Sequence, residues 1–323
     1  MPPRLEAGAF HEQGWWGEVT SSVNWCELDY DVTKFICEFC NTLSSAAILL
    51  VGLVGLALHF RALERRFAVA FAAVMAVGAG SIGFHTTLRH EWQMMDEVPM
   101  LWSALSMTFI LVEDKAESVH GRWFPLALAA HGTVTTLLVA LSGGALQFVL
   151  FHTSFGTLEF YSLYRVYLLW SKATGTESPA PVAVRRLYRQ GFGCYGVGLV
   201  CWATDLLCCE TMRSALPANP QLHAWWHVFV SGGLYSLLLC VAHNRCAVLG
   251  QRPSIAWLCG CLPYVALPPM EVVGKRMVLH PPTPSSSSGG SGGGGGGESG
   301  RGARARSPSP QRRRRSKSRD KRS

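Results

Sequence analysis

Residues 39–60 read FCNTLSSAAILLVGLVGLALHF, a stretch without a single Asp, Glu, Lys or Arg. A helix of about 20 apolar residues crosses the hydrocarbon core of a bilayer, so this stretch predicts a membrane-spanning helix. Further stretches of similar character follow after short connections, at 67–86, 93–112, 123–142, 145–170, 187–208 and 222–242. We therefore expect an all-α, polytopic membrane protein built as a bundle of seven transmembrane helices.

The overall composition agrees with a membrane protein. Charged residues make up 15% of the chain, against about 25% in typical soluble domains. The net charge of +8 comes from the end of the chain, where residues 298–323 hold eleven Lys or Arg and two acidic residues. Because the rest of the chain is close to neutral, we expect no nucleic-acid-binding surface on it.

These patterns divide the chain into four parts. Residues 1–38 form an N-terminal segment outside the membrane, and residues 39–247 form the helical domain. Within residues 248–282, the apolar stretch 255–268 is too short for an eighth span and predicts a segment at the membrane interface. Residues 283–323 are rich in Gly and Ser and then in Arg and Ser, which predicts a disordered tail.

The orientation follows from the distribution of Lys and Arg, which are enriched in cytosolic loops. The N-terminus and the loops on its side of the membrane hold only Arg4, Lys34, Arg89 and Arg213. The opposite side holds Arg61, Arg65, Arg66, Lys115, Arg122, Lys172, Arg185, Arg186, Arg189, Arg245 and Arg252. The sequence therefore predicts a lumenal N-terminus and a cytosolic C-terminus.

Ionisable residues inside spanning helices are costly and mark functional sites. His85 closes the second predicted helix, Asp96 lies near the start of the third, and His223 and His227 open the seventh. His223 and His227 share one helix face because they are four residues apart. With a lumenal N-terminus, all four residues lie at similar depth near the lumenal leaflet.

Three histidines at one depth fit a catalytic zinc site, which keeps one position open for water. Asp96 would then be an acid or base beside that water. A structural role is the alternative for any single histidine, and we assign it to His131, His152 and His243. Glu159, Arg165 and Asp205 are expected to form internal polar pairs.

The predicted lumenal segment contains oxygen ligands that suit a hard cation such as Ca²⁺. They include Asn24, Glu27, Asp29 and Glu38, and their spacing differs from that of an EF-hand. A solvated acidic segment is the alternative. Of the eleven cysteines, Cys26, Cys208 and Cys209 lie outside or at the edges of the apolar runs, so at most a single disulfide is expected there.

Several motifs together resemble the alkaline ceramidases, a family of seven-helix hydrolases, and the resemblance runs from about residue 15 to residue 269. The motifs are Trp16-Gly17-Glu18, Asn24-Trp25-Cys26-Glu27, Glu38-Phe39-Cys40-Asn41-Thr42, Gly80-Ser81-Ile82-Gly83-Phe84-His85-Thr86-Thr87-Leu88, Asp96-Glu97-Val98-Pro99-Met100 and His223-Ala224-Trp225-Trp226-His227.

The resemblance implies a role for each motif. The zinc ligands would be His85, His223 and His227, the water-activating acid Asp96 and the oxyanion-stabilising hydroxyl Ser81. The calcium ligands would be Asn24, the backbone carbonyl of Trp25, Glu27, Asp29 and Glu38. Asn24 stands where some members have Asp, which removes one negative charge. A lumenal disulfide from Cys26 to Cys209 is also implied, with Cys208 as an alternative partner.

The implied function is hydrolysis of the ceramide amide to a sphingoid base and a fatty acid, in sphingolipid metabolism. The resemblance further implies a substrate that enters from the bilayer, a location in the endoplasmic reticulum or Golgi membrane, and no obligate protein partner. The alternatives are a related hydrolase that remodels ester lipids, a zinc-containing seven-helix receptor, and a transporter or channel. The loop charges disfavour the receptor, whose family is inverted in the membrane, and no inverted repeat supports a transporter.

Overall fold

The computed structural model describes residues 14–175, 180–268, 270–273 and 276–279. The described part is predominantly helical, and seven helices follow one another along it. They are α1 (Phe39–His59), α2 (Arg65–Thr87), α3 (His90–Val112), α4 (Trp123–Ala140), α5 (Gly144–Thr174), α6 (Val182–Ala215) and α7 (Leu222–Val248). Each lies where the sequence predicts a helix, although α2, α5 and α6 extend beyond the predicted bounds at both ends and α3 and α7 at one end.

Six of the described helices are long and apolar enough to cross a membrane, namely all except α5. Helix α5 is long enough but carries Gln147, His152, Glu159 and Arg165 along its length. Those polar residues lower its hydropathy. The structure therefore confirms a helical protein with several candidate spans and leaves the seventh span as a prediction.

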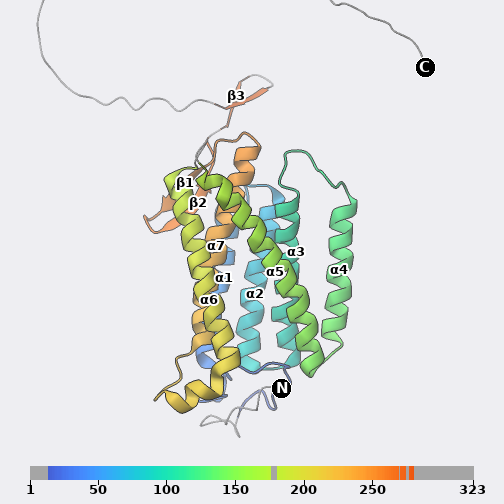
Figure 1. The fold of residues 1–323 in the computed structure, drawn as a ribbon, viewed down its shortest axis with the longest axis vertical. Coiled ribbons are helices and arrows are strands. Elements are labelled where there is room, and N and C mark those ends of the chain that lie inside the picture. The colour runs from blue at the N-terminus through green and yellow to red at the C-terminus, as the bar shows by residue number, and fades with distance from the viewer. Residues whose placement is uncertain (1–13, 176–179, 269, 274–275, 280–323) are drawn as a thin grey trace, which may run out of the picture. The chain divides into compact units, whose positions relative to one another are not determined.

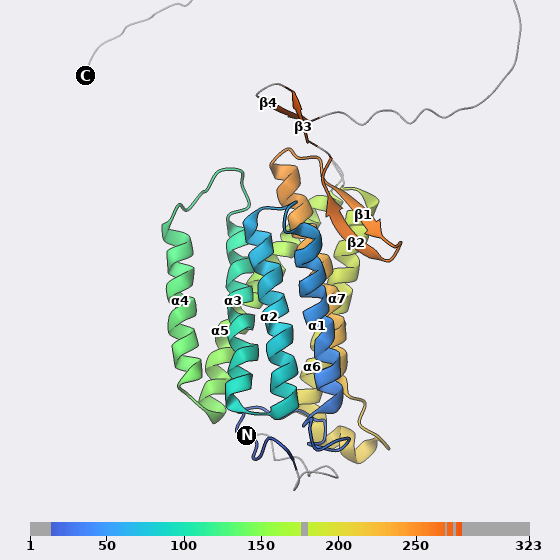
Figure 2. The same ribbon diagram turned by 180° about the vertical axis from the view of Figure 1, so that it is seen from behind.

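The helices run alongside one another in a bundle (Figures 1 and 2). Helix α1 packs against α2 and α7, α2 packs against α3, and α6 packs against α7. Helix α5 contacts α3 closely but touches α6 and α7 only sparsely. Helix α4 lies at the edge of the bundle beside α3 and α5 (Figure 2).

Two glycines explain why α2 lies so close to its neighbours. A Cβ added at Gly78 would lie 2.2 Å from the backbone nitrogen of Leu49 in α1. A Cβ added at Gly80 would lie 1.9 Å from the carbonyl oxygen of Met95 in α3. Small residues allow such backbone contact between membrane helices. The contact at Gly80 places the start of α3 directly against the turn of α2 that carries Ser81.

The expectation of an all-helical chain is wrong for the region after α7. Strands β1 (Ser254–Leu258) and β2 (Leu262–Ala266) form an antiparallel hairpin in which Ser254 pairs with Ala266. Cys259 and Gly260 adopt positive φ angles in the turn, which reverses the chain within the apolar stretch 255–268. Strands β3 (Met270–Val273) and β4 (Arg276–Leu279) form a second short hairpin.

The first hairpin is fixed to the end of the bundle opposite the N-terminal segment (Figure 1). The N–H of Val265 donates to Nε2 of His59 over 3.1 Å, and the Tyr235 hydroxyl donates to the carbonyl of Pro263 over 2.7 Å. Val265 is buried in the main hydrophobic core, so the hairpin closes that end of the bundle.

The N-terminal segment covers the other end. Its backbone N–H groups at Cys37 and Glu38 donate to the carbonyls of Thr86 and His85 at the end of α2, each over 2.9 Å. A disulfide between Cys26 and Cys209 joins the segment to α6, and Cys208 remains a free, exposed thiol. Residues 1–13 and the predicted tail, 283–323, lie outside the described residues.

Candidate metal centre and lipid cavity

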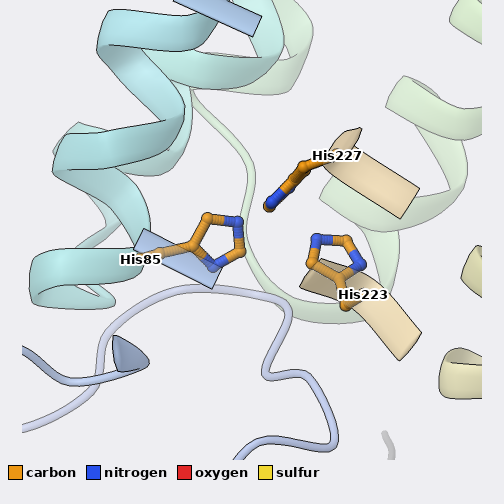
Figure 3. A group of neighbouring side chains, drawn as sticks. All are labelled: His85, His223 and His227. Carbon is orange, nitrogen blue, oxygen red and sulfur yellow. The ribbon is translucent and has the colours of Figure 1, made fainter. Parts of the chain in front are cut away.

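The three histidines named from the sequence come together inside the bundle. His85 projects from the last turns of α2, and His223 and His227 project from the first turns of α7. One possible ligand atom from each lies within 4.8 Å of the others, and all three side chains are buried. Figure 3 shows a nitrogen of each ring directed toward the space between the rings. Among the described residues, no other group of His, Cys, Asp or Glu meets this criterion.

The hydrogen bonds of His85 determine which of its nitrogens faces that space. Its Nδ1 lies 2.5 Å from Oε2 of Glu38, a fully buried carboxylate. The ring therefore donates from Nδ1, and the lone pair of Nε2 remains for a metal ion. A carboxylate behind a ligating histidine fixes the tautomer and raises the basicity of the ligand.

Two serines of α1 have the same effect on His227. Ser44 Oγ lies 3.1 Å from the carbonyl of Asn41, to which it donates, and 2.8 Å from Nδ1 of His227. Ser45 Oγ also lies 3.4 Å from this Nδ1. With the Ser44 proton directed at the Asn41 carbonyl, Nδ1 of His227 donates to Ser44. Its Nε2 is then a free acceptor, as in His85.

His223 is held differently. Its ring stacks on Trp25, with 3.6 Å between the ring centroids, and its backbone N–H lies 3.3 Å from Oδ1 of Asp205. The other carboxyl oxygen of Asp205 accepts the N–H of Cys26 over 2.9 Å. Nδ1 of His223 is buried and has no hydrogen-bond partner among the described residues. Asp205 thus connects the N-terminal segment to α7 through two hydrogen bonds. This agrees with the prediction that Asp205 forms an internal polar contact.

Ser81 and Asp96 reach the same centre from α2 and α3. Both line a cavity of about 280 Å³ that His223 and His227 also line. Ser81 Oγ lies 2.9 Å from Ser45 Oγ, and Ser45 donates to the Asn41 carbonyl over 2.7 Å. The Ser81 hydroxyl therefore donates to Ser45 in this structure and would have to turn to serve a ligand.

The cavity extends from the histidines along the inner faces of α2, α3, α5, α6 and α7. Its walls are mainly apolar and include Val74, Met100, Phe155, Leu163, Trp226 and Leu234. The main polar group deep inside is Glu159, whose Oε1 accepts the Tyr195 hydroxyl over 2.6 Å. This pair bridges α5 and α6 and confirms the predicted internal pairing of Glu159. Such a cavity suits a long-chain lipid.

The predicted calcium ligands lie in the N-terminal segment beneath this centre. Glu27 accepts the N–H groups of Cys40 and Asn41 over 2.6 and 2.9 Å, which caps the first turn of α1. Burial raises the pKa of Glu27 to about 7, although those hydrogen bonds lower it. Burial also raises the pKa of Glu38 well above its usual range, and the charge of Asp29 adds to the effect.

A bound cation would offset the repulsion between these buried carboxylates. Asn24 Nδ2 donates to Oδ2 of Asp29 over 3.2 Å, which leaves Oδ1 of Asn24 buried and without a hydrogen-bond partner among the described residues. Oδ1 of Asn41 is in the same situation. Amide and carboxylate oxygens of this kind are suitable ligands for Ca²⁺.

Sequence reasoning missed three groups of residues around the centre. Ser44 and Ser45 orient His227 and Ser81, and their position one helical turn after Asn41 was the available signal. Gln93 and Gln147 hold the carboxyl of Glu97 beside Asp96. Glu38 contacts His85, a contact that the sequence does not reveal because 47 residues separate the two.

The residues assigned to structural roles behave in several ways. His131 contacts Ser154 on an exposed face, and Arg165 donates to the carbonyl of Leu111. His152 lines the cavity and stacks on Phe148. His152 is therefore part of the wall of the lipid cavity, which its position in the sequence did not indicate.

The chain therefore combines helices that could span a membrane with a buried three-histidine centre beside an apolar cavity. These features place it among helical proteins with a candidate metal site. The sequence model of the family described as Ceramidase matches residues 17–266. The chain belongs to the ceramidase family, and the prediction that it is a ceramidase is confirmed.

Two curated relatives support this assignment. Alkaline ceramidase 3 of Mus musculus is 30% identical over 278 residues, covering 82% of this chain and 99% of the relative. The alkaline ceramidase of Arabidopsis thaliana is 32% identical over 258 residues, covering 78% of this chain and 94% of the relative. The matches thus span nearly the whole length of both relatives.

Proposed function

We propose that this protein is a zinc-dependent intramembrane ceramidase that hydrolyses the amide bond of ceramide to a sphingoid base and a fatty acid. The observation that carries the proposal is the position of the three-histidine centre at one end of a long apolar cavity. The names of the relatives supply the substrate class.

The donor set fits zinc. His85 and His227 each donate from Nδ1 and so keep Nε2 free, and three imidazoles leave an open position in a tetrahedral site. We assign His85, His223 and His227 as the ligands, with Glu38 and Ser44 orienting two of them. A zinc ion in such a site lowers the pKa of a bound water from about 15.7 to about 7 and polarises a carbonyl group.

Asp96 and Ser81 supply the remaining chemistry. Asp96, which lines the cavity with His223 and His227, would accept the proton of the attacking water and deliver it to the departing sphingoid amine, as general base and then general acid. The Ser81 hydroxyl would turn from Ser45 toward the substrate and donate to the developing oxyanion. Because both side chains are buried, these interactions would be stronger than in bulk water.

The cavity provides the route for the substrate. Its apolar walls would hold the two hydrocarbon chains while the amide lies at the histidines. We propose that the lipid enters laterally between α5 and α6, whose backbones approach each other at few positions. The Glu159–Tyr195 hydrogen bond and the Trp170–Phe192 ring contact, with 5.5 Å between centroids, join the two helices.

We further propose one Ca²⁺ bound by Asn24, the Trp25 carbonyl, Glu27, Asp29 and Glu38. It would neutralise the buried carboxylates and hold the N-terminal segment against α1 and α2. Glu38 would then contribute to both metal sites, because one of its oxygens contacts His85. Calcium chelation should lower both stability and activity, and added Ca²⁺ should restore them.

The proposed topology keeps seven spans, a lumenal N-terminus and a cytosolic C-terminus. We include α5 as the seventh span, although its hydropathy is too low by composition alone, because Gln147, His152 and Glu159 line the cavity or belong to a polar network. The Cys26–Cys209 disulfide suits an oxidising lumen. We propose the endoplasmic reticulum or Golgi membrane as the location and assign no nucleic acid or obligate protein partner.

The test is to incubate the purified, detergent-solubilised protein with ceramide and, separately, with an acylated glycolipid ester. We expect release of fatty acid and free sphingoid base from ceramide, and no release above background from the ester. Hydrolysis of the ester alone would instead favour an ester-remodelling lipid hydrolase. Binding without turnover of either lipid would favour a receptor.

A further inference from the structure

Glu97 follows Asp96 in α3 and has no role in the chemistry described above. Its side chain is only 6% exposed, yet it lines the same cavity as Asp96, Ser81, His223 and His227. An ionisable side chain within a membrane helix is costly and marks a functional site. Its position beside the proposed reacting groups makes substrate recognition the function to consider.

The carboxyl of Glu97 is held in place by two glutamines. Gln93 Nε2 donates to Oε1 over 2.8 Å, and Gln147 Nε2 donates to Oε2. Gln93 is itself fixed, because its Oε1 accepts the N–H of Ser22 over 2.7 Å. Both glutamines present N–H groups, so they keep Glu97 an acceptor, and each of its oxygens can accept a further hydrogen bond.

We propose that Glu97 is a specificity-determining residue that accepts a hydrogen bond from a hydroxyl of the sphingoid base. This inference rests on the proposed ceramidase function. In ceramide, the carbon that bears the amide nitrogen lies between two carbons that each carry a hydroxyl group. Asp96 and Glu97 both line the cavity. If Asp96 serves the amide nitrogen, Glu97 is the neighbouring carboxyl in the same cavity that could receive one of those hydroxyls.

The surroundings strengthen this assignment. A hydroxyl that leaves water for an apolar cavity needs a new partner. Near Glu97 the cavity wall is apolar at Val77, Met100 and Ala104. A lipid without the hydroxyl would bind without donating a hydrogen bond to Glu97. A site that leaves a buried polar group unpaired in this way discriminates strongly against the lipid that lacks the hydroxyl.

The experiment compares ceramide with its 1-deoxy and 3-deoxy analogues in detergent micelles. Three proteins are assayed: wild type, the single variant Glu97→Gln, and the exchange variant Gln93→Glu with Glu97→Gln. The exchange variant moves the carboxylate by one helical turn. It keeps the net charge and the complementary donor and acceptor groups between positions 93 and 97 and between 97 and 147. It removes the 3.1 Å hydrogen bond from Gln93 Nε2 to Gln147 Oε1, so its thermal stability is measured beside its kinetics.

Wild type should hydrolyse one of the two analogues with kcat/KM about 10- to 100-fold below that for ceramide, as expected for a lost hydrogen bond to a charged acceptor. The exchange variant should still fold but lose most of this discrimination through slower hydrolysis of ceramide. A purely structural Glu97 predicts instead that the exchange variant keeps wild-type discrimination, and that result would overturn the proposal. Wild type that hydrolyses both analogues as fast as ceramide would also overturn it, whereas wild type inactive on ceramide would refute the proposed function itself.

Discussion

The substitution Glu38→Gln tests whether the buried carboxylate prepares the metal centre. Three N–H groups point at its two oxygens: the backbone of Trp25 over 3.1 Å, Nδ2 of Asn41 over 3.3 Å and Nδ1 of His85 over 2.5 Å. A glutamine offers a single acceptor oxygen, so at least one of these donors would face an NH₂ group. Loss of such a partner behind a ligating histidine typically weakens metal affinity 10- to 100-fold, or about 1.4–2.8 kcal/mol at about 1.4 kcal/mol per tenfold change.

The assay is competition for zinc between the purified protein and a chelator of known affinity, in saturating Ca²⁺. Glu27→Gln is the matched control, because Glu27 is also buried and also belongs to the proposed calcium site. Its oxygens accept the N–H groups of Cys40 and Asn41, and the Cys40 thiol also donates to it, so its described hydrogen bonds include no proposed zinc ligand. Glu38→Gln should weaken zinc binding and Glu27→Gln should not. Equal zinc affinity in the two variants would refute the reasoning.

Further substitutions test the remaining groups. Asp96→Asn should keep zinc but lose about 10²–10⁴ in kcat, and Ser81→Ala about 10²–10³, both measured by sphingoid base release with parallel metal analysis; near-normal rates in both would remove these assignments. Gly80→Ala should cost about 1–3 kcal/mol of stability and slow hydrolysis, because the new methyl group collides with the Met95 carbonyl and displaces α3; a thermal melt equal to wild type would contradict this packing. The N–H groups of Val119 and His120 hold the pKa of Glu113 at about 2, well below its usual value of 4.5. A depressed pKa stabilises the folded protein above pH 4.5, and the benefit is lost as the pH falls toward 2. Wild type should therefore lose its stability advantage over Glu113→Gln across that interval in melting experiments, and an unchanged difference would argue against the hydrogen bonds.

Much of the fold could be predicted because a membrane helix requires a run of about 20 apolar residues, which can be recognised in the sequence. Apolar runs gave the positions of all seven helices, and the spacing of His223 and His227 placed both on one face. His85 could be placed at the same depth as His223 and His227 because successive membrane helices alternate in direction. The end of the second helix and the start of the seventh therefore lie on the same side of the membrane. These inferences need only the length of the apolar runs, the spacing of residues within one helix and the order of the helices along the chain.

The features that escaped prediction depend on contacts between distant segments. The hairpin at Ser254–Ala266 forms where an apolar stretch is too short to span, and its anchoring by His59 is a tertiary contact. Helix α5 carries polar residues that only a cavity can explain. The proton positions on His85 and His227 follow from Glu38 and Ser44, which no sequence spacing connects to them. The cavity itself depends on how the helices pack against one another.

The central claim is that His85, His223 and His227 together hold a catalytic zinc ion in a ceramidase. The most direct measurement is elemental analysis of the purified protein combined with a ceramide hydrolysis assay, for wild type and for His223→Ala. We predict about one zinc per chain and release of sphingoid base in wild type, with both lost in a His223→Ala protein that still inserts and folds. Full zinc occupancy in the His223→Ala protein, or undiminished ceramide hydrolysis by it, would contradict the account.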